Sequence, residues 1–345
     1  MEMHKPELKS MNLKELTAFV TEYGQKPFRA KQLFLWMHKK LAASVDEMTD
    51  ISAAFRETIK NECVYTALKQ ENVQLSKADG TRKYLFRLDD GNLIESVFMR
   101  YKTGNSVCIS SQAGCRMGCK FCASAINGLE RNLLPSELLE QVYRISQDVN
   151  ERISHVVVMG TGEPLDNYDN LLRFIELLCG EDGLHISQRN VTVSTCGIVP
   201  RILDLANENL SVTLALSLHA ADQKKREELM PIAFRYGLFD ILTACQYYFE
   251  KTGRRITFEY ALFAGINDSM EDAAGLARLL SGKNCHVNLI PVNPVKERGF
   301  ARPDRETVQA FYGCLQKSGI NVTIRREMGS DIDAACGQLR KRYME

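Results

Sequence analysis

The residues best suited to chemistry are three cysteines in one short loop, Cys115, Cys119 and Cys122, within the sequence CRMGCKFC. Three thiolates at this spacing can bind three irons of a 4Fe–4S cluster, which leaves the fourth iron without a protein ligand. An open iron can chelate the amino and carboxylate groups of S-adenosylmethionine (SAM). One electron from the cluster then splits the sulfonium and yields a 5′-deoxyadenosyl radical.

Two other interpretations of this loop stay open. One is a zinc site with a distant fourth ligand, and the other is a set of thiols without a shared role. Zinc knuckles usually use paired C-x2-C units, and no second pair lies near the loop. The chain has 11 cysteines, and closely spaced cysteines in a cytosolic protein favour metal binding or catalysis over disulfides. The spacing therefore favours the iron–sulfur cluster.

Two further cysteines are candidates for covalent chemistry. Cys108 lies seven residues before the loop, and Cys336 lies in the segment DIDAACGQL near the C-terminus. A lone cysteine is more often a small buried apolar side chain than a nucleophile. The loop around Cys336 raises its chance of a functional role, because loops carry function more often than packing.

The elements that must position these residues repeat a strand and a helix six times from residue 106. The expected strands are residues 107–111, 155–160, 191–195, 212–217, 256–262 and 286–290, with a final candidate at 322–326. This alternation predicts a parallel sheet with helices outside, either open or closed into a partial barrel. Polar segments follow the strands, and the carboxyl ends of parallel strands share the face where sites are built.

The rest of the chain is expected to be accessory. Residues 1–80 are predicted to form a helical accessory unit, 81–104 a β-hairpin connector around Asp90-Gly91, 105–327 the core, and 328–345 a tail that carries Cys336. The N-terminus does not resemble a signal peptide, and no apolar run approaches the ~20 residues of a membrane span. A cytoplasmic protein without membrane contact is expected.

The charge balance does not by itself predict a nucleic-acid partner, because the net charge is only +1. Local basic clusters could still contact phosphates. The candidate clusters are Arg29 to Lys40, Lys224 to Arg226, Arg298 with Arg302, Arg325 with Arg326, and Arg340 to Arg342.

Four stretches carry a resemblance to a known family: SVCISSQAGCRMGCKFCA, MGTGEPLDNYDN, HVNLIPVNP and DIDAACGQL. Together they resemble the RlmN/Cfr family of radical SAM RNA adenine methyltransferases, over residues 26–340. The resemblance implies an α/β fold with a (β/α)6 partial barrel of the radical SAM type. It also implies one 4Fe–4S cluster, two SAM molecules per turnover, 23S rRNA and tRNA as substrates, and an electron donor such as flavodoxin.

The resemblance also implies roles for single residues. Cys336 would carry a methyl group taken from SAM, and the radical would remove hydrogen from that S-methyl group before it adds to the base. Cys108 would resolve the resulting enzyme–RNA adduct through a disulfide with Cys336, and Glu95 is a candidate proton acceptor. The implied SAM contacts are Gly162, Glu163, Ser194, Ser217, Leu218, His219 and Asn293.

Carbon 2 of adenosine is the expected target, because Pro291, Arg116-Met117 and the Gly-Glu-Pro segment are more similar to the carbon-2 group of the family. The nearest alternative is a carbon-8 rRNA methyltransferase that confers antibiotic resistance. A second alternative, from another functional class, is a non-enzymatic iron–sulfur or zinc module that binds RNA.

Overall fold

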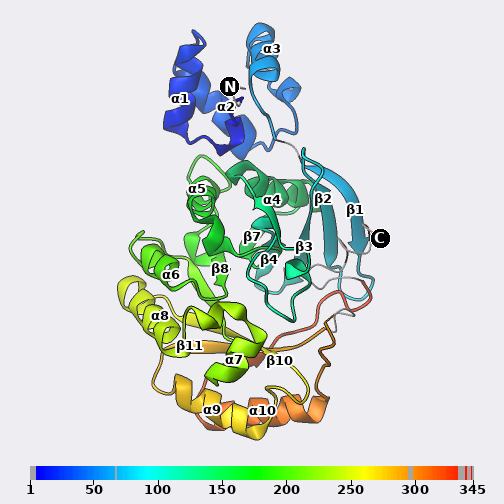
Figure 1. Cartoon of the computed structure of the whole chain (residues 1–345). Coiled ribbons are helices and arrows are strands. Elements are labelled where there is room, and N and C mark those ends of the chain that lie inside the picture. Colours follow the sequence, from blue (N-terminus) through cyan, green and yellow to red (C-terminus); the bar gives the residue numbers. More distant parts are fainter. Residues whose placement is uncertain (1–4, 67, 294–297, 333–338, 340–342, 344–345) are drawn as a thin grey trace.

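The computed structural model describes residues 5–66, 68–293, 298–332, 339 and 343 (Figure 1). The chain begins with three helices, α1 (Leu13–Glu22), α2 (Phe28–His38) and α3 (Ala53–Glu62). Asn12 and Glu15 form a capping box that satisfies free backbone N–H groups where α1 begins. These helices confirm that the first 62 residues are mainly helical.

The next segment corrects one expectation. Residues 69–75 were expected to be helical, but they form the strand β1 (Lys69–Leu75). It pairs antiparallel with β2 (Arg82–Arg87), which pairs antiparallel with β3 (Leu93–Tyr101). The expected hairpin around Asp90-Gly91 is confirmed as the β2–β3 connection. Strand β3 then pairs antiparallel with β4 (Gly104–Ile109), which begins the parallel part of the sheet.

The expected parallel strands are all present. They are β4, β7 (Ile153–Val158), β8 (Val191–Thr195), β9 (Thr213–Ser217), β10 (Ile256–Leu262), β11 (Cys285–Pro291) and β12 (Val322–Ile324). The helices between them are α4 (Pro135–Val149), α5 (Tyr168–Cys179), α6 (Val199–Ala206), α7 (Gln223–Leu229), α8 (Leu238–Thr252), α9 (Met270–Leu280) and α10 (Arg305–Lys317).

The strand order distinguishes the partial barrel from a doubly wound sheet. The ten strands follow one another in sequence order, from β1 through β4, then β7 to β12. Because parallel crossovers are right-handed, an order without a reversal puts all the helices on one face of the sheet. Figure 1 shows α5, α6, α8, α9 and α10 around the outside of the curved sheet. In the described chain β1 and β12 do not pair, so the barrel is open.

A second, two-stranded sheet holds the three-cysteine loop. Strands β5 (Gln112–Gly114) and β6 (Leu129–Asn132) pair antiparallel, and the loop lies between them. The cysteine loop therefore follows the carboxyl end of β4 closely in the chain.

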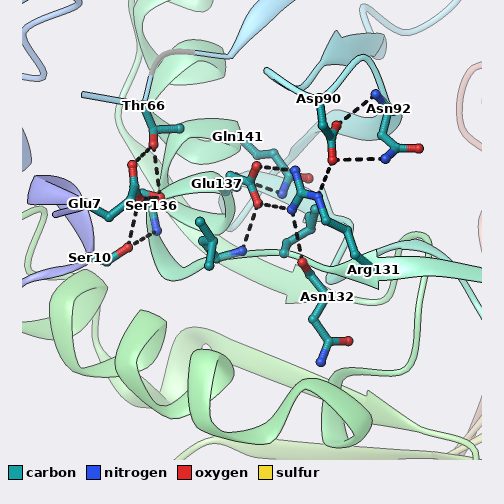
Figure 2. A network of polar contacts seen from close by, with 12 residues as sticks. Glu7, Ser10, Thr66, Asp90, Asn92, Arg131, Asn132, Ser136, Glu137 and Gln141 are labelled. Carbon is teal, nitrogen blue, oxygen red and sulfur yellow. Dashed lines mark hydrogen bonds and ion pairs between the residues drawn. The ribbon is translucent and has the colours of Figure 1, made fainter. Parts of the chain in front are cut away.

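Helix α4 joins the N-terminal helices to the barrel. Lys9 forms an ion pair with Glu140 of α4, and both side chains are almost fully buried. Figure 2 shows Glu7 together with Ser10, Thr66 and Ser136 at the start of α4. His38 of α2 contacts the hydroxyl of Tyr143 at 2.8 Å. Among the described helices, none combines the length and apolar character that a bilayer span requires.

Candidate active site at the carboxyl end of the barrel

The base of the three-cysteine loop is fixed by backbone contacts. The Cys115 N–H donates to the Gly128 carbonyl at 2.7 Å, next to the β5–β6 pair. Gly114 has φ 81°, and a Cβ there would lie 2.1 Å from the Gly128 oxygen. Only glycine fits this close approach. The ends of the loop are therefore held together by backbone contacts that use none of the three thiols.

The thiols of the loop lie in an environment that disfavours negative charge. Burial raises the pKa of Cys115 to about 12, and the neighbouring Cys122 adds to the rise. Burial also raises the pKa of Cys119, as do Cys122 and Cys115. Three thiolates so close together repel one another, and cationic irons would remove that repulsion. The donor set therefore fits a metal group.

The spacing of the three cysteines along the sequence, four and then three residues apart, is the feature that suits a cluster with several irons. A 4Fe–4S cluster takes one thiolate at each of three irons, so its ligands stand apart. Cys115, Cys119 and Cys122 would hold those irons.

The cysteine loop packs against a layer of apolar side chains. Met117, Cys119 and Phe121 pack against buried side chains at the carboxyl ends of the later strands, including Phe263. The Phe121 ring meets the edge of the His219 ring with centroids 4.9 Å apart. The cluster loop and the predicted SAM segment after β9 are thus in direct contact.

His219 is held in one orientation and is neutral. Its φ is 57°, a strained value for a non-glycine residue. Its Nδ1 accepts a hydrogen bond from the Ala261 N–H at 2.9 Å. Burial lowers its pKa to about 3. Leu218 is fully buried beside it, and its N–H donates to the Glu259 carbonyl at 3.0 Å.

The segment after β7 packs tightly against Gln112, the first residue of β5. Gly162 has φ 109°, and a Cβ there would lie 2.6 Å from the Gln112 Cβ. Glu163 is buried, and its N–H donates to the Gln112 Oε1 at 2.8 Å. Its two carboxylate oxygens accept the N–H groups of Leu165 at 3.0 Å and Cys196 at 2.7 Å. Burial raises the Glu163 pKa, and these hydrogen bonds oppose the rise.

The remaining predicted SAM contacts lie at the same end of the barrel. Ser194, near the end of β8, donates its hydroxyl to the Val158 carbonyl at 2.9 Å. Ser217 is the last residue of β9, and Asn293 lies exposed two residues after β11. All seven predicted contacts therefore lie at or just after strand carboxyl ends, as does the cysteine loop.

Cys108 and Glu95 lie on the same face of the sheet. Cys108 of β4 is opposite Val97 of β3, and Glu95 is two residues before Val97. Because side chains alternate along a strand, Glu95, Val97 and Cys108 point to one side. Glu95 is buried and forms an ion pair with buried Lys83 at 2.7 Å. A carboxylate on a hairpin strand is usually solvated, so this burial distinguishes Glu95.

Cys336 lies outside the described residues, but described neighbours on both sides of it contact this region. Asp331 accepts hydrogen bonds from the Ser76 hydroxyl at 2.6 Å and the Lys77 N–H at 2.8 Å. Met328 packs against the apolar group that includes Cys108. Leu339 packs with Leu85 and Leu93 of β2 and β3.

Three basic residues have contacts near the site that the sequence did not predict, although Arg226 and Arg298 were listed among the basic clusters. Lys83 is the partner of Glu95, and Arg298 donates to the Cys122 carbonyl at 3.0 Å. Arg226 was assigned to a surface cluster with Lys224 and Lys225, and this was wrong, because Arg226 is fully buried. Sequence pattern gives no signal for these contacts, since each joins segments from different strands or loops.

Two family models match the chain. The model described as the ribosomal RNA large subunit methyltransferase N-terminal domain matches residues 6–64. The radical SAM superfamily model matches residues 109–277. This superfamily uses a 4Fe–4S cluster and SAM, which agrees with the cysteine loop and the segments around it.

Curated relatives match almost the full chain. A protein of Lachnospira eligens named a probable dual-specificity RNA methyltransferase RlmN is 59% identical, over 98% of this chain and 97% of the relative. A protein of the same name from Lachnoclostridium phytofermentans is 55% identical, over 99% of this chain and 96% of the relative.

The fold has a close experimental counterpart. The crystal structure of a radical SAM methyltransferase from Sphaerobacter thermophilus matches with a TM-score of 0.93 and 41% identity. The match covers 96% of this chain and 98% of the other. The fold, the cysteine loop and the similarity to these relatives all indicate the same family. The chain therefore belongs to the RlmN family of radical SAM enzymes.

Proposed function

We propose that this enzyme methylates carbon 2 of adenosine in 23S rRNA and in tRNA, at the adenosine 3′ of the anticodon. The observation that carries the proposal is the gathering of the three-cysteine loop and the SAM segments at one end of the barrel, in a chain 59% identical to a protein named as a dual-specificity RNA methyltransferase. In the ribosomal RNA the target would lie in the peptidyl-transferase region.

One 4Fe–4S cluster on Cys115, Cys119 and Cys122 and two SAM molecules per turnover would serve the reaction. When bound, the cluster and one SAM supply a one-electron cleavage that gives a 5′-deoxyadenosyl radical. The seven strand-end residues from Gly162 to Asn293 would orient SAM. His219 is suited to this because a neutral ring with Nδ1 already occupied presents only Nε2.

Cys336 would carry the methyl group as an S-methyl thioether formed by displacement from one SAM. Cys336 is three residues from Leu339, so the two Cα atoms lie within about 11 Å of each other. Leu339 contacts Leu85, and Leu85 is opposite Glu95 in the sheet. This anchoring supports a carrier cysteine near Glu95 and Cys108.

Cys108 would resolve the covalent enzyme–RNA adduct. Its thiolate attacks the Cys336 sulfur, a disulfide forms, and the bond between that sulfur and the methylene carbon breaks. The electron pair stays on the product, which takes up a proton to complete the methyl group. Before that step the radical adduct would lose one electron, back to the cluster, and the proton on carbon 2, so that the aromatic ring is restored. Glu95 or Cys108 would accept this proton, and Lys83 would hold the Glu95 carboxylate in place.

RNA would reach the site with its target adenine turned out of the stack. We propose that residues 1–80 contact the RNA and that the hairpin, core and tail divide at residues 81–104, 105–327 and 328–345. Arg29, Lys31 and Lys40 of this N-terminal region are exposed or half-buried. The electron would come from a donor protein such as flavodoxin, in the cytoplasm.

The decisive test is mass spectrometry of RNA digests after anaerobic reaction with SAM and dithionite. The expected product is 2-methyladenosine, whereas 8-methyladenosine would overturn the choice of carbon. Cys336→Ala should form neither product nor S-methylcysteine, and Cys108→Ala should accumulate RNA covalently attached to Cys336. Cys314→Ala changes a thiol of α10 away from the site and is the matched control, with normal turnover expected. A colourless zinc protein without 5′-deoxyadenosine would favour a non-enzymatic module.

A further inference from the structure

Arg226 is a fully buried cation at the carboxyl end of the barrel. It belongs to α7, and its guanidinium donates to backbone carbonyls after β8 and β9. The acceptors are Cys196 at 2.7 Å, Leu218 at 3.2 Å and Ser217 at 3.3 Å. The arginine therefore connects the ends of two strands that also carry predicted SAM contacts.

The charge of Arg226 is not balanced by an acidic side chain. No carboxylate forms an ion pair with it in the part of the chain that the structure describes, and its Nη1 is buried without a hydrogen-bond partner there. Burial lowers its pKa, but an arginine side chain stays protonated in proteins. A buried charge without a counter-charge is costly, and such a charge is seldom kept for packing alone.

The three-cysteine loop is packed directly on the segment that carries Arg226. The Lys120 N–H donates to the carbonyl of Leu229, the last residue of α7, at 2.9 Å. Cys119 packs with Leu229 and Met230 in one apolar cluster. The positive charge of Arg226 also favours the thiolate of Cys119, while burial and the other loop thiols disfavour it. A thiolate-bound cluster on this loop would therefore lie beside the segment that carries the Arg226 charge.

We propose that Arg226 is a positioning residue that stabilises the reduced 4Fe–4S cluster through its fixed positive charge. Reduction adds one electron, taken from a low-potential donor, to a group that already carries three thiolates. A nearby cation favours that extra negative charge and so raises the reduction potential. The proposal rests on the cluster assignment above, but it does not depend on which RNA or which carbon is methylated.

A purely structural role makes a different prediction. Arg226 could instead serve only to donate hydrogen bonds to the carbonyls of Cys196, Ser217 and Leu218. The reduction potential of the cluster would then respond to any change in side-chain geometry, and it would not depend on the charge. Lysine keeps the charge but loses the planar guanidinium, whereas glutamine keeps a planar donor but loses the charge. The two variants therefore separate the two roles.

The test is a potentiometric titration of the reconstituted holoenzyme, followed by the electron paramagnetic resonance signal of the reduced cluster. In Arg226→Gln the ratio of reduced to oxidised cluster at a fixed potential should fall at least tenfold, which is 59 mV for one electron. Arg226→Lys should stay within about threefold of the wild type. Arg201→Gln, at an exposed side chain of α6, is the matched control, and the potential of its cluster should not shift.

The outcomes discriminate clearly. An unchanged potential in Arg226→Gln, or equal shifts in the Gln and Lys variants, overturns the proposal. A wild-type protein that binds no 4Fe–4S cluster defeats the cluster assignment instead. If Arg226→Gln does not fold, the Lys variant is titrated between pH 7 and about 9.5, where a buried amine loses its proton. Its potential should then fall relative to wild type at the same pH, and a parallel course of the two proteins overturns the proposal.

Discussion

The joint, where Glu7, Lys9 and His38 of the N-terminal region contact α4, and the region around the cysteine loop both contain buried charged side chains. These charges are balanced differently in the two regions. At the joint, Lys9 is paired with Glu140, and the Glu7 carboxylate accepts hydrogen bonds from Ser10, Thr66 and Ser136. Figure 2 shows the adjoining group, in which Arg131 contacts Glu137 and Asp90. Near the loop, Arg226 has only carbonyls and Glu163 only backbone N–H groups as hydrogen-bond partners among the contacts described above.

This difference indicates what each region is for. Charges at the joint are neutralised within the chain, so they stabilise the docking of the N-terminal helices on α4. Near the loop Arg116 pairs with Asp166, but Arg226 has no carboxylate partner in the described part of the chain, which makes its position poorly suited to stability and well suited to a bound group of opposite charge. Changes at the loop should therefore affect binding, and changes at the joint should affect folding.

The largest expected effect is the loss of the cluster in Cys119→Ala. The substitution removes one of the three proposed iron ligands, so the brown 4Fe–4S absorbance and the bound iron should disappear after reconstitution. The free energy of unfolding of the metal-free protein should change by less than about 1 kcal/mol. Cys245→Ala, at a buried thiol outside the site, should do the reverse, with the cluster retained and about 1–2 kcal/mol of stability lost. A stable cluster in Cys119→Ala would remove it from the ligand set.

Next in size is the effect of Lys9→Met at the joint. The substitution leaves buried Glu140 with Arg144, at 2.7 Å, as its remaining ion-pair partner, and should cost about 2–3 kcal/mol in urea unfolding. The double variant Lys9→Met/Glu140→Met removes both charges and should recover much of that loss. If the single and double variants are equally unstable, the charge pair is not the source of the effect.

Lowering the pH should reduce the free energy of unfolding, because each of the two regions contains a buried histidine. Burial lowers the pKa of His38 at the joint and of His219 at the site to about 3, from an ordinary value of 6.5. Between these values the unfolded chain binds more protons, so stability falls as the pH falls. Each histidine contributes a slope of up to about 1.4 kcal/mol per pH unit. Between pH 6 and 4, His38→Gln should reduce the slope of unfolding free energy against pH by up to about 1.4 kcal/mol per pH unit. An unchanged slope would contradict the lowered pKa of His38.

The smallest effect is expected for a surface ion pair beside the joint. Arg173 of α5 contacts Glu15 of α1 at 2.7 Å, and both side chains are partly exposed. Arg173→Gln should change the free energy of unfolding by less than about 1 kcal/mol, and less still in 0.5 M salt. A loss as large as that in Lys9→Met would show that charge, and not burial, sets the strength of the joint.

The core of the fold was predictable because its strands have a clear pattern. Residues 191–195 and 256–262 are short apolar runs between turn signals, and both are strands with the expected bounds. Strand β1 was missed because its sequence, KQENVQL, is polar and its side chains are mostly exposed. An edge strand without apolar alternation carries no signal of its own.

Contacts between distant segments of the candidate site were beyond sequence reasoning. The burial of Glu95 depends on Lys83, which reaches it only through the register of β2 and β3. Arg226 follows two lysines in the sequence and resembles solvated surface, yet α7 turns it inward. The spacing of Cys115, Cys119 and Cys122 was readable because their loop is local, while the roles of Cys108 and Cys336 stay predictions.

The glycine contact between residues 114 and 128 has a consequence for how the metal enters. The hydrogen bond from the Cys115 N–H to the Gly128 carbonyl uses backbone atoms alone, so the entropy of closing the 14-residue segment 115–128 is lost on folding and does not depend on any metal ligand. Binding of the cluster then requires only small changes within a loop whose two ends are already joined by a backbone hydrogen bond. Chelation and reloading should proceed on the folded protein, with the same denaturant midpoint before the first cycle and after it.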